Sequence, residues 1–430
     1  LNTFVTKGYL QYKITSTNGG YNMTEFKDVP KSSIATDTIL AYSVSIPVGV
    51  TQSYTIEFKY ANDESVDQSD DMGRKLSGKL FITEGTIDPA VYYAGYEKGT
   101  LGYQIMSDNP TRSTRSNNNN GTNDFATPLT ATTTGTLFKS TESITGITTL
   151  PKEVYYYAGN TTNNWVKFGG FYWRIIRTNH DGSIRLLYVG TSHDTKTGNI
   201  GYSAFNTSHN SPKYVGYKYG EDTSLDTIRN NTTDSTIKTY VDNWYKNNLI
   251  NYTKYLSTSA VYCNDRSLGT GQTYSTSSKF RFASYYRMGY DTYGAKANPS
   301  YNCIDIRDAF SVDNTSAKLT YPVSLMTVDE IVFAGGVAYT KMTTPYAWFI
   351  SNSIGTQVSS SWWSLSPANW AGSRANVWCW NSAPTYLLNY NVYYTNGVRP
   401  AVSLKSCTLY STGDGSATNP YTILETESGC

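Results

Sequence analysis

Hydrophobic and polar residues alternate over several short segments in the first 90 residues of the chain. These segments are rich in β-branched and aromatic side chains, and clusters of Gly, Pro, Asn and Asp separate them. Alternation with a period of two is typical of a strand with one buried face. The segments are residues 9–14, 39–46, 54–60 and 79–83. We therefore predict a small antiparallel β-sandwich or jelly roll over residues 1–90.

The pattern changes near residue 151, where strand and helix signals begin to mix. Apolar and aromatic residues fill 166–178, a polar Asn-His-Asp-Gly turn follows, and 183–190 is apolar again, which predicts a β-hairpin. The segment before this part is rich in Thr, Asn and Ser and keeps neither a strand nor a helix period. The predicted parts are a β domain at 1–90, a connector at 91–150 and an α+β domain at 151–430.

Two segments of the C-terminal part have helical character. Residues 233–249 begin with Asp and Ser residues that can cap a helix. A period of 3.6 then places four residues on one face: Ile237, Tyr240, Val241 and Trp244. The second helix is short, because Thr327 and Glu330 form a capping box and Gly335 ends it. The predicted fold class is mainly β, with two helices in the C-terminal α+β domain.

Charge and composition narrow the possible partners. Charged residues make up 16% of the chain, below the roughly 25% of an average domain, and there are 39 tyrosines. Such neutral polar composition is typical of extracellular β structure. A net charge of +2 argues against nucleic acid as a partner. No apolar run reaches the roughly 18 residues of a membrane span, and a start at Leu1 suggests a mature form after signal-peptide removal.

The five cysteines form neither a CxxC pair nor a Cys/His cluster, which argues against a zinc site. Two disulfides and one remaining thiol fit the count better. The preferred pairing joins Cys263 to Cys303 and Cys407 to Cys430, and it leaves Cys379 free. Because disulfides persist in oxidising compartments, this pairing predicts an extracellular or cell-surface location.

Residues 361–404 form a run of Trp, Tyr, Asn and Ser with few charged side chains. Amphipathic rings and adaptable amides favour recognition surfaces, because they give a large contact area at low entropic cost. A second interpretation is a polar sheet with aromatic cross-strand pairs. The two interpretations are about equally compatible with the residue types.

If residues 374–380 form a strand, the recognition-surface interpretation predicts which side chains contact the ligand. A period of two puts the larger residues of this strand on one face and Ala375, Val377 and Cys379 on the other. We expect the larger set to be exposed, because contiguous exposed tryptophans usually mark a contact. The candidate ligand-binding residues are Asn369, Trp370, Arg374, Asn376, Trp378, Trp380, Asn381, Tyr386, Asn389, Asn391 and Tyr393.

Four ordered motifs resemble those of C-type-lectin-like domains in bacterial and phage surface proteins. They are FGGFYWRIIR with DGSIRLL at 168–187, LMTVDEIVFAGG at 325–336, WWSLSP at 362–367 and GVRPAVSL at 397–404. In such domains the stretch between the last two motifs is a ligand-binding face, which retroelements diversify in some members. The resemblance implies a C-type-lectin-like fold and a ligand-binding role for 362–394.

Residues 44–85 resemble the β domain of camelysin/TasA-type biofilm fibre proteins. Those proteins are thought to assemble by lending an N-terminal strand to the next subunit, which implies β-augmentation here. The residues of such an assembly strand are Phe4, Val5, Tyr9, Leu10, Tyr12 and Ile14. The alternative is an ordinary first strand within its own sheet.

Cofactor and catalytic signals are few. Asp63, Asp67 and Asp70 cluster in a loop where they could bind Ca²⁺, although a solvated turn is the simpler interpretation. No other cofactor is expected. GxSxG and HExxH motifs are missing, and the histidines lie in polar, turn-like segments, so the sequence predicts no enzyme.

The predicted function is that of a secreted cell-surface or filament protein that displays a lectin-like domain for adhesion. Its ligand would be a glycan or a protein on another cell or phage, and the N-terminal domain would form a homopolymer. One alternative is a purely structural subunit of an extracellular fibre. Another is an oxidative enzyme of the formylglycine-generating type that uses Cys379 and Cys407, which is disfavoured because the RGGSW and GFR motifs of that group are missing.

Overall fold

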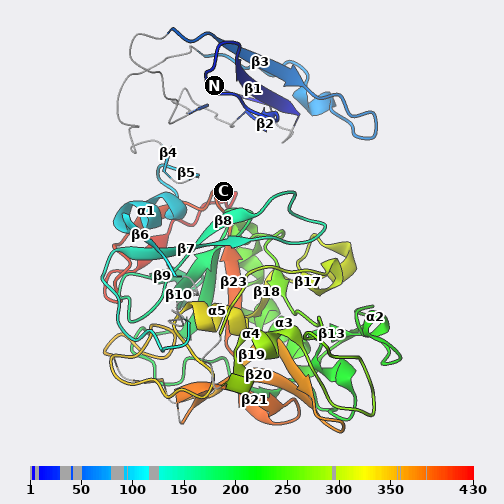
Figure 1. The fold of residues 1–430 in the computed structure, drawn as a ribbon. Helices are drawn as coiled ribbons and strands as arrows, with labels where there is room; N and C mark the ends of the chain where they lie inside the picture. Colours follow the sequence, from blue (N-terminus) through cyan, green and yellow to red (C-terminus); the bar gives the residue numbers. More distant parts are fainter. Residues whose placement is uncertain are drawn as a thin grey trace. The chain divides into compact units, whose positions relative to one another are not determined.

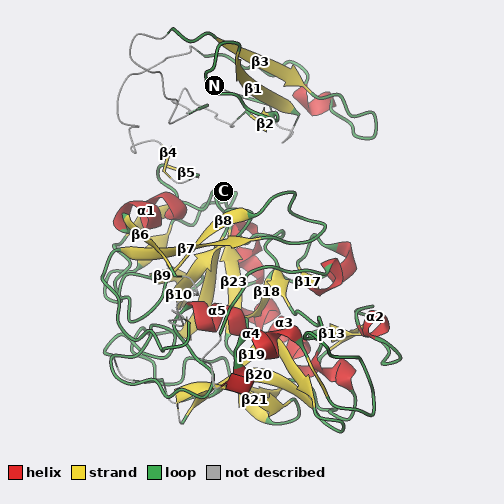
Figure 2. Cartoon of the chain, viewed as in Figure 1, coloured by secondary structure: helices red, strands yellow, loops and turns green. Residues whose placement is uncertain are grey.

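The chain folds into two compact units, Leu1–Lys98 and Gly99–Cys430, in which strands predominate and most helices are short (Figure 2). The prediction of mainly β structure is confirmed. The computed structural model describes residues 2–4, 9–29, 40–41, 51–78, 92–93, 95–115, 125–292, 297–355, 357–358, 360–383 and 385–430.

Three strands form an antiparallel sheet in the first unit, in the order β2–β1–β3. β1 (Leu10–Ser16) pairs along its whole length with β3 (Tyr54–Tyr60) and over two residues with β2 (Lys27–Asp28). These strands confirm the predictions at 9–14 and 54–60. The predicted strand at 79–83 and most of that at 39–46 lie outside the described residues. The second sheet of a sandwich stays a prediction.

The strand predicted to be lent to a neighbour is the middle strand of its own sheet. Leu10, Tyr12 and Ile14 are buried, and the last two pack against Met23. The hydroxyl of Tyr9 donates to Asp63 at 3.1 Å, and the ring of Phe4 lies 5.7 Å from that of Tyr60. Val5 lies outside the described residues. The structure therefore corresponds to the alternative of an ordinary first strand.

The acidic loop of the first unit uses its carboxylates as turn acceptors. Asp63 accepts from the backbone and hydroxyl of Ser65, and Asp67 accepts from the backbone of Ser69. Asp70 lies in a short 3₁₀ helix, η1 (Ser69–Asp71). Over the described ranges, no group of three or more His, Cys, Asp or Glu could hold a metal ion. Calcium binding stays a prediction, and the contacts seen are those of a polar turn.

The second unit is built on two sheets. The larger sheet runs β18 (Val323–Leu325), β23 (Pro400–Leu404), β11 (Ile184–Gly190), β10 (Phe171–Thr178), β8 (Lys152–Tyr156), β7 (Thr136–Glu142) and β6 (Thr111–Thr114). β9 (Trp165–Phe168) pairs with β10 and with β25 (Tyr421–Ile423), which pairs with β24 (Tyr410–Thr412). The predicted hairpin is confirmed as β10–β11. Its first strand starts later than predicted, because Gly169 and Gly170 turn the chain with positive φ.

The second sheet carries the Trp- and Tyr-rich run and lies along the lower edge of the unit in Figure 1. Its order is β12 (Tyr202–Ala204), β22 (Thr395–Gly397), β19 (Trp362–Trp370), β20 (Ala375–Ser382) and β21 (Thr385–Asn391). β16 (Phe280–Arg281) also pairs with β19. Arg281 of β16 thus lies opposite Asn369 of β19, although almost 90 positions separate the two residues in the sequence.

Both predicted helices are confirmed. Ser235 caps α3 (Thr236–Asn248), and Thr327 with Glu330 forms the capping box of α5 (Val328–Phe333). Ile237 and Val241 are buried as expected, but Lys238 and Tyr245 are buried as well. The structure also has α1 (Leu101–Asp108), α2 (Leu225–Ile228) and α4 (Ala283–Arg287).

The remaining elements are short. The strands are β4 (Tyr92–Tyr93) and β5 (Tyr96–Glu97), which belong to the first unit, and β13 (Lys218–Tyr219), β14 (Thr233–Asp234), β15 (Tyr262–Cys263) and β17 (Ala309–Phe310). The 3₁₀ helices are η2 (Pro212–Val215), η3 (Ile250–Tyr255), η4 (Tyr290–Thr292), η5 (Ile306–Asp308) and η6 (Thr315–Ala317).

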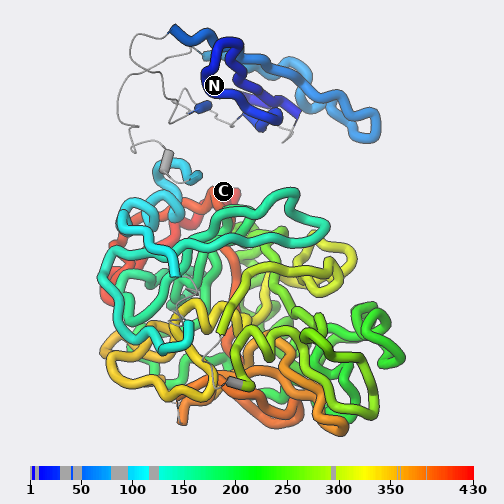
Figure 3. The backbone as a smooth tube through the Cα atoms, viewed as in Figure 1, coloured from blue at the N-terminus to red at the C-terminus, as the bar shows by residue number. Residues whose placement is uncertain are grey.

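The predicted connector at 91–150 belongs, from Gly99 onward, to the second unit. It supplies α1, β6 and β7, and β7 pairs with β8 in the large sheet. Figure 3 shows α1 beside the C-terminal segment, where the Tyr421 hydroxyl donates to Asp108 at 2.8 Å. These elements are only four to eight residues long, so their hydrophobic pattern is too brief to show a period.

A buried ionic network ties the hairpin to α5. Arg177 lies 2.8 Å from Glu142 and 2.9 Å from Glu330, and Arg185 lies 2.6 Å from Glu330. Burial opposes ionisation of both glutamates. The positive charges of the neighbouring arginines have the larger effect, and they hold the pKa of Glu142 and of Glu330 below the usual range. The charged residues of the hairpin and helix motifs are therefore framework residues.

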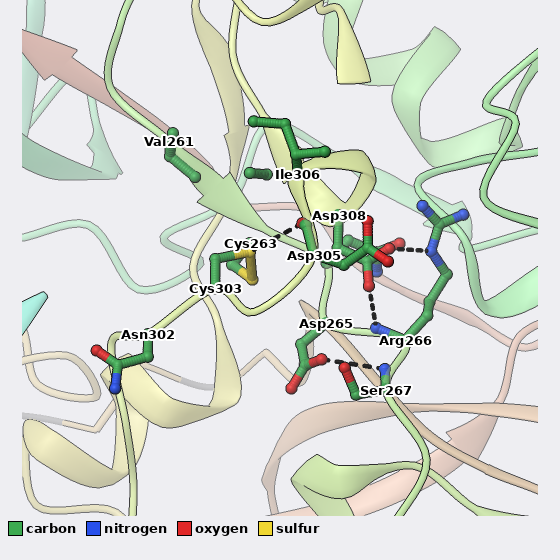
Figure 4. The surroundings of a disulfide bond; sticks show 12 residues. Val261, Cys263, Asp265, Arg266, Ser267, Asn302, Cys303, Asp305, Ile306 and Asp308 are labelled. Carbon is green, nitrogen blue, oxygen red and sulfur yellow. Dashed lines mark hydrogen bonds and ion pairs between the residues drawn. A yellow bond between two sulfur atoms is a disulfide. The ribbon is translucent and has the colours of Figure 1, made fainter. Parts of the chain in front are cut away.

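Both predicted disulfides are present. Cys263–Cys303 spans 40 residues, Cys407–Cys430 spans 23, and Cys379 is free and buried. Figure 4 shows the first bridge close to the ion pair of Arg266 with Asp308, whose closest atoms are 2.7 Å apart. Two disulfides are compatible with an extracellular protein. In the described part of the chain, no helix has the length and apolar character to cross a membrane.

Candidate ligand-binding surface

The three predicted ligand-binding tryptophans lie in the core. Trp378 is 0% exposed, and Trp370 and Trp380 are buried to nearly the same extent. Asn381 is buried too, and its Oδ1 accepts from the hydroxyl of Ser361 at 3.1 Å. The prediction that the larger side chains of β20 are exposed is therefore wrong for these residues.

Both faces of β20 are covered, which explains the error. On one face, Nε1 of Trp378 donates to the hydroxyl of Ser284 in α4 at 3.1 Å, and the ring of Trp380 meets Phe349 edge-on at 4.9 Å. On the other face, Nε1 of Trp363 donates to the carbonyl of Ser203 at 2.9 Å. Alternation in a sequence predicts two faces, but it does not tell whether a second layer covers the polar one.

A row of polar side chains crosses the end of this sheet. The strand register pairs Arg281 with Asn369, Asn369 with Asn376, and Asn376 with Asn391. Directly opposite residues of antiparallel strands project from the same face, so the four side chains lie in line across β16, β19, β20 and β21. Nδ2 of Asn376 donates to Oδ1 of Asn369 at 3.3 Å. We call Asn369, Asn376 and Asn391 the asparagine row.

The asparagine row has unused hydrogen-bonding capacity. Asn369 and Asn376 are half-buried, and Asn391 is only 5% exposed. Oδ1 of Asn391 accepts from the backbone of Tyr393 at 3.3 Å, whereas its Nδ2 has no hydrogen-bond partner among the described residues. A buried amide donor without a partner costs about 1–3 kcal/mol.

Exposed tyrosines adjoin the row where β21 ends. Tyr393 and Tyr394 are 40% and 44% exposed, and their ring centroids lie 4.6 Å apart. The ring of His209 lies 4.8 Å from Tyr393, and that of Tyr390 lies 5.9 Å from Tyr394. We call Tyr390, Tyr393, Tyr394 and His209 the tyrosine surface. The buried tryptophans support this sheet, and the tyrosines provide its exposed aromatic area.

Three exposed basic side chains surround the row. Arg281 stands at its end, and Lys279 is two residues earlier. The side chain of Lys279 lies against Gly372, since a Cβ atom added to this glycine would be 3.5 Å from the Cγ of the lysine. Gly372 belongs to the turn that also carries Arg374. Arg374 interacts electrostatically with Tyr393. Residues 361–398 contain no Lys, Asp or Glu, and Asp291 is the acidic residue that interacts with Arg281.

The structure brings together five of the eleven predicted site residues at one end of the sheet: Asn369, Arg374, Asn376, Asn391 and Tyr393. Asn389 lies farther along β21, opposite Trp378, and Tyr386 lies at the other end of the strand, opposite Asn381. Trp370, Trp378, Trp380 and Asn381 are buried. Sequence reasoning missed Lys279, Arg281 and His209, because no local pattern links a two-residue strand to a sheet formed 90 positions later. Tyr394 lay inside the run and could have been found as a tyrosine of the turn after β21.

The cysteines offer no reactive group at this surface. Cys379 is buried, and burial raises the pKa of its thiol well above the ordinary value. Cys407 is bonded to Cys430. The oxidative-enzyme alternative depended on Cys379 and Cys407. The first is a buried thiol and the second is part of a disulfide.

Comparison with known proteins adds no family assignment. No protein-family model matches the chain, and searches of curated proteins and of solved structures gave no significant match.

Proposed function

We propose that the chain is an extracellular or cell-surface binding protein whose second unit holds its ligand on the asparagine row and the tyrosine surface. The observation that carries the proposal is the alignment of Asn369, Asn376 and Asn391 beside the exposed pair Tyr393 and Tyr394. Amides supply directed hydrogen bonds, and tyrosines supply contact area with few rotatable bonds. Tyrosines commonly contribute a large share of the energy at binding surfaces.

The surroundings support a surface that is rigid before the ligand arrives. The row projects from paired strands, and buried indoles pack beneath them on both faces. A preorganised surface loses less conformational entropy when it binds, which favours affinity. The resemblance of the flanking motifs to C-type-lectin-like domains points to the same stretch, and the two disulfides fit an extracellular setting.

The test compares two tyrosine variants of the full chain. Tyr393→Ala combined with Tyr394→Ala removes the exposed pair, and Tyr202→Ala removes an exposed tyrosine from β12 of the same sheet as a matched control. Wild type and both variants are screened on arrays of glycans and of extracellular proteins. We expect the double variant to lose at least tenfold in affinity for any hit, about 1.4 kcal/mol, with an unchanged melting temperature.

The control defines the outcome that contradicts the proposal. Tyr202→Ala should bind like wild type, because it leaves the end of β21 intact. Equal affinity of the double variant and wild type would place the ligand elsewhere, and a chain that binds no probe in either array would remove the proposal.

A second candidate function is that of a fibre subunit. Among the described strands of the first unit, β3 is the last in the sheet order, and its Phe58 and Tyr60 are exposed. An exposed edge strand with apolar side chains is suited to pairing with another chain. Electron microscopy of the purified chain tests this candidate: regular filaments that disappear in Phe58→Lys would favour it, and dispersed particles at all concentrations would reject it.

A further inference from the structure

The charges around the asparagine row point to the class of ligand. Lys279, Arg281 and Arg374 are exposed at one corner of the sheet, and Asp291 is the carboxylate that interacts with them through Arg281. Among the described residues, the three cations and the one carboxylate named here leave this corner positive, and residues 361–398 contain no acidic side chain. A positive corner on a nearly neutral chain selects for an anionic partner.

The donors of the row are suited to a carboxylate that has hydroxyl neighbours. The guanidinium of Arg281 lies over the ring of Tyr285, 4.7 Å from its centroid, and this exposed residue can bind a carboxylate through two parallel hydrogen bonds. Next to it, Asn369 and Asn376 offer both amide donors and amide acceptors, as vicinal hydroxyl groups require. A sugar acid presents this combination of one carboxylate and several hydroxyls within a few ångströms.

The tyrosine surface supplies the apolar half of such a site. The C–H face of a pyranose ring is flat and apolar, so it packs well against an exposed phenol ring. Tyr393 and Tyr394 present two adjacent rings of this kind, with planes inclined by 35° to one another. The pair directly follows Asn391, so a chain of sugars could contact the rings and the row together.

The edge of β21 argues against an extended peptide that adds a strand. The backbone of Leu387 donates to the carbonyl of Val337 and accepts from the N–H of Tyr339, each at 3.2 Å. Thr385 accepts from Met342 at 2.9 Å, and Asn391 accepts from Tyr394 at 3.0 Å. Outward-facing backbone groups of Thr385, Leu387 and Asn391 are therefore already paired within the chain. Recognition at this place depends on side chains rather than on main-chain pairing.

We infer that the asparagine row and the tyrosine surface bind an acidic polysaccharide, with a uronic acid at the Arg281 end and a neighbouring sugar on Tyr393 and Tyr394. This inference rests on the proposed function and names its ligand class. Binding is noncovalent, and the carboxylate is held as an ion.

Matched sugars test the charge requirement. The probes are hexasaccharides of galacturonic acid and of hyaluronan, together with their methyl esters, which keep the rings and hydroxyls but remove the negative charge. Isothermal titration calorimetry with the full chain should show at least tenfold tighter binding of one of the acids than of its ester. Raising the salt concentration from 50 to 500 mM should weaken only the binding of the acid.

Charge variants of the protein test the location. Lys279→Gln combined with Arg281→Gln should lower affinity for the acid at least tenfold without changing the melting temperature. The matched control combines Lys139→Gln in β7 with Lys246→Gln in α3, two exposed lysines, and should bind like wild type. Asn376→Asp should weaken binding of the acid more than binding of the ester, because both ligands lose the amide donor and the new carboxylate repels only the charged one.

Each result separates this inference from the proposed function. Equal affinity for acid and ester, or normal binding by the Lys279/Arg281 variant, overturns the acidic ligand while the tyrosine-dependent surface stands. Binding of an array protein but of neither sugar, lost in the Tyr393/Tyr394 variant, overturns the sugar and keeps the surface. Absence of binding to every sugar and every array protein overturns both.

Discussion

Replacement of Trp378 by alanine should destabilise the second unit rather than remove a ligand contact. The indole is 0% exposed, its ring centroid lies 5.6 Å from that of Tyr290, and its Nε1 donates to Ser284. Truncating a buried tryptophan to alanine costs about 3–5 kcal/mol, because apolar contacts are lost and a cavity remains. The hydroxyl of Ser284 keeps its bond to the carbonyl of Pro367, so no further buried donor is left unpaired.

Urea unfolding followed by circular dichroism measures this cost. We expect Trp378→Ala to lower the unfolding midpoint at an unchanged m-value, which is the signature of lost stability in a two-state transition. Tyr394→Ala is the matched aromatic control, and its 44% exposed ring should contribute within about 0.5 kcal/mol. A Trp378→Ala protein that unfolds at the wild-type midpoint and loses ligand binding would show that the indole is a surface contact, and it would refute the reasoning.

Two further predictions concern buried charge and thiol chemistry. Glu330→Gln should cost about 3–5 kcal/mol, because it leaves Arg177 and Arg185 facing a neutral amide. The pKa of Glu330 is held below the roughly 4.3 of an unfolded chain, so its contribution to the free energy of unfolding is complete above that pH and is lost as pH falls toward the folded pKa. Urea midpoints between pH 3 and 7 should therefore fall less steeply in the variant than in wild type, and parallel curves would contradict the assignment. Because burial raises the pKa of the Cys379 thiol, a thiol reagent should find no reactive group in the native chain and one in urea, whereas a higher count would mean that a disulfide is missing.

Features with a local cause could be predicted from the sequence. The cap of α3 at Ser235 and the capping box of Thr327 with Glu330 depend on residues within one helical turn. The β10–β11 hairpin follows from a polar turn between two apolar segments. Both disulfide pairings were also predicted, since each closes a loop within one part of the chain.

Features that depend on distant segments could not be predicted. Trp378 is buried because Ser284 and neighbouring residues of α4 cover its face from more than 90 positions away. Composition identified Asn369, Asn376 and Asn391 as candidates, but their alignment depends on a register that no single strand encodes. Arg281 completes the row from a two-residue strand, which is too short to leave a pattern.

The position of the asparagine row has a consequence for how this protein can evolve. Its side chains stand at the rim of paired strands, whereas the residues that hold those strands together lie beneath them in the interior. On the proposed function, exchange of the half-buried Asn369 or Asn376 for another polar group would alter what is recognised and leave the buried scaffold untouched. A lineage carrying this fold could therefore change its target by single substitutions, without an intermediate that fails to fold.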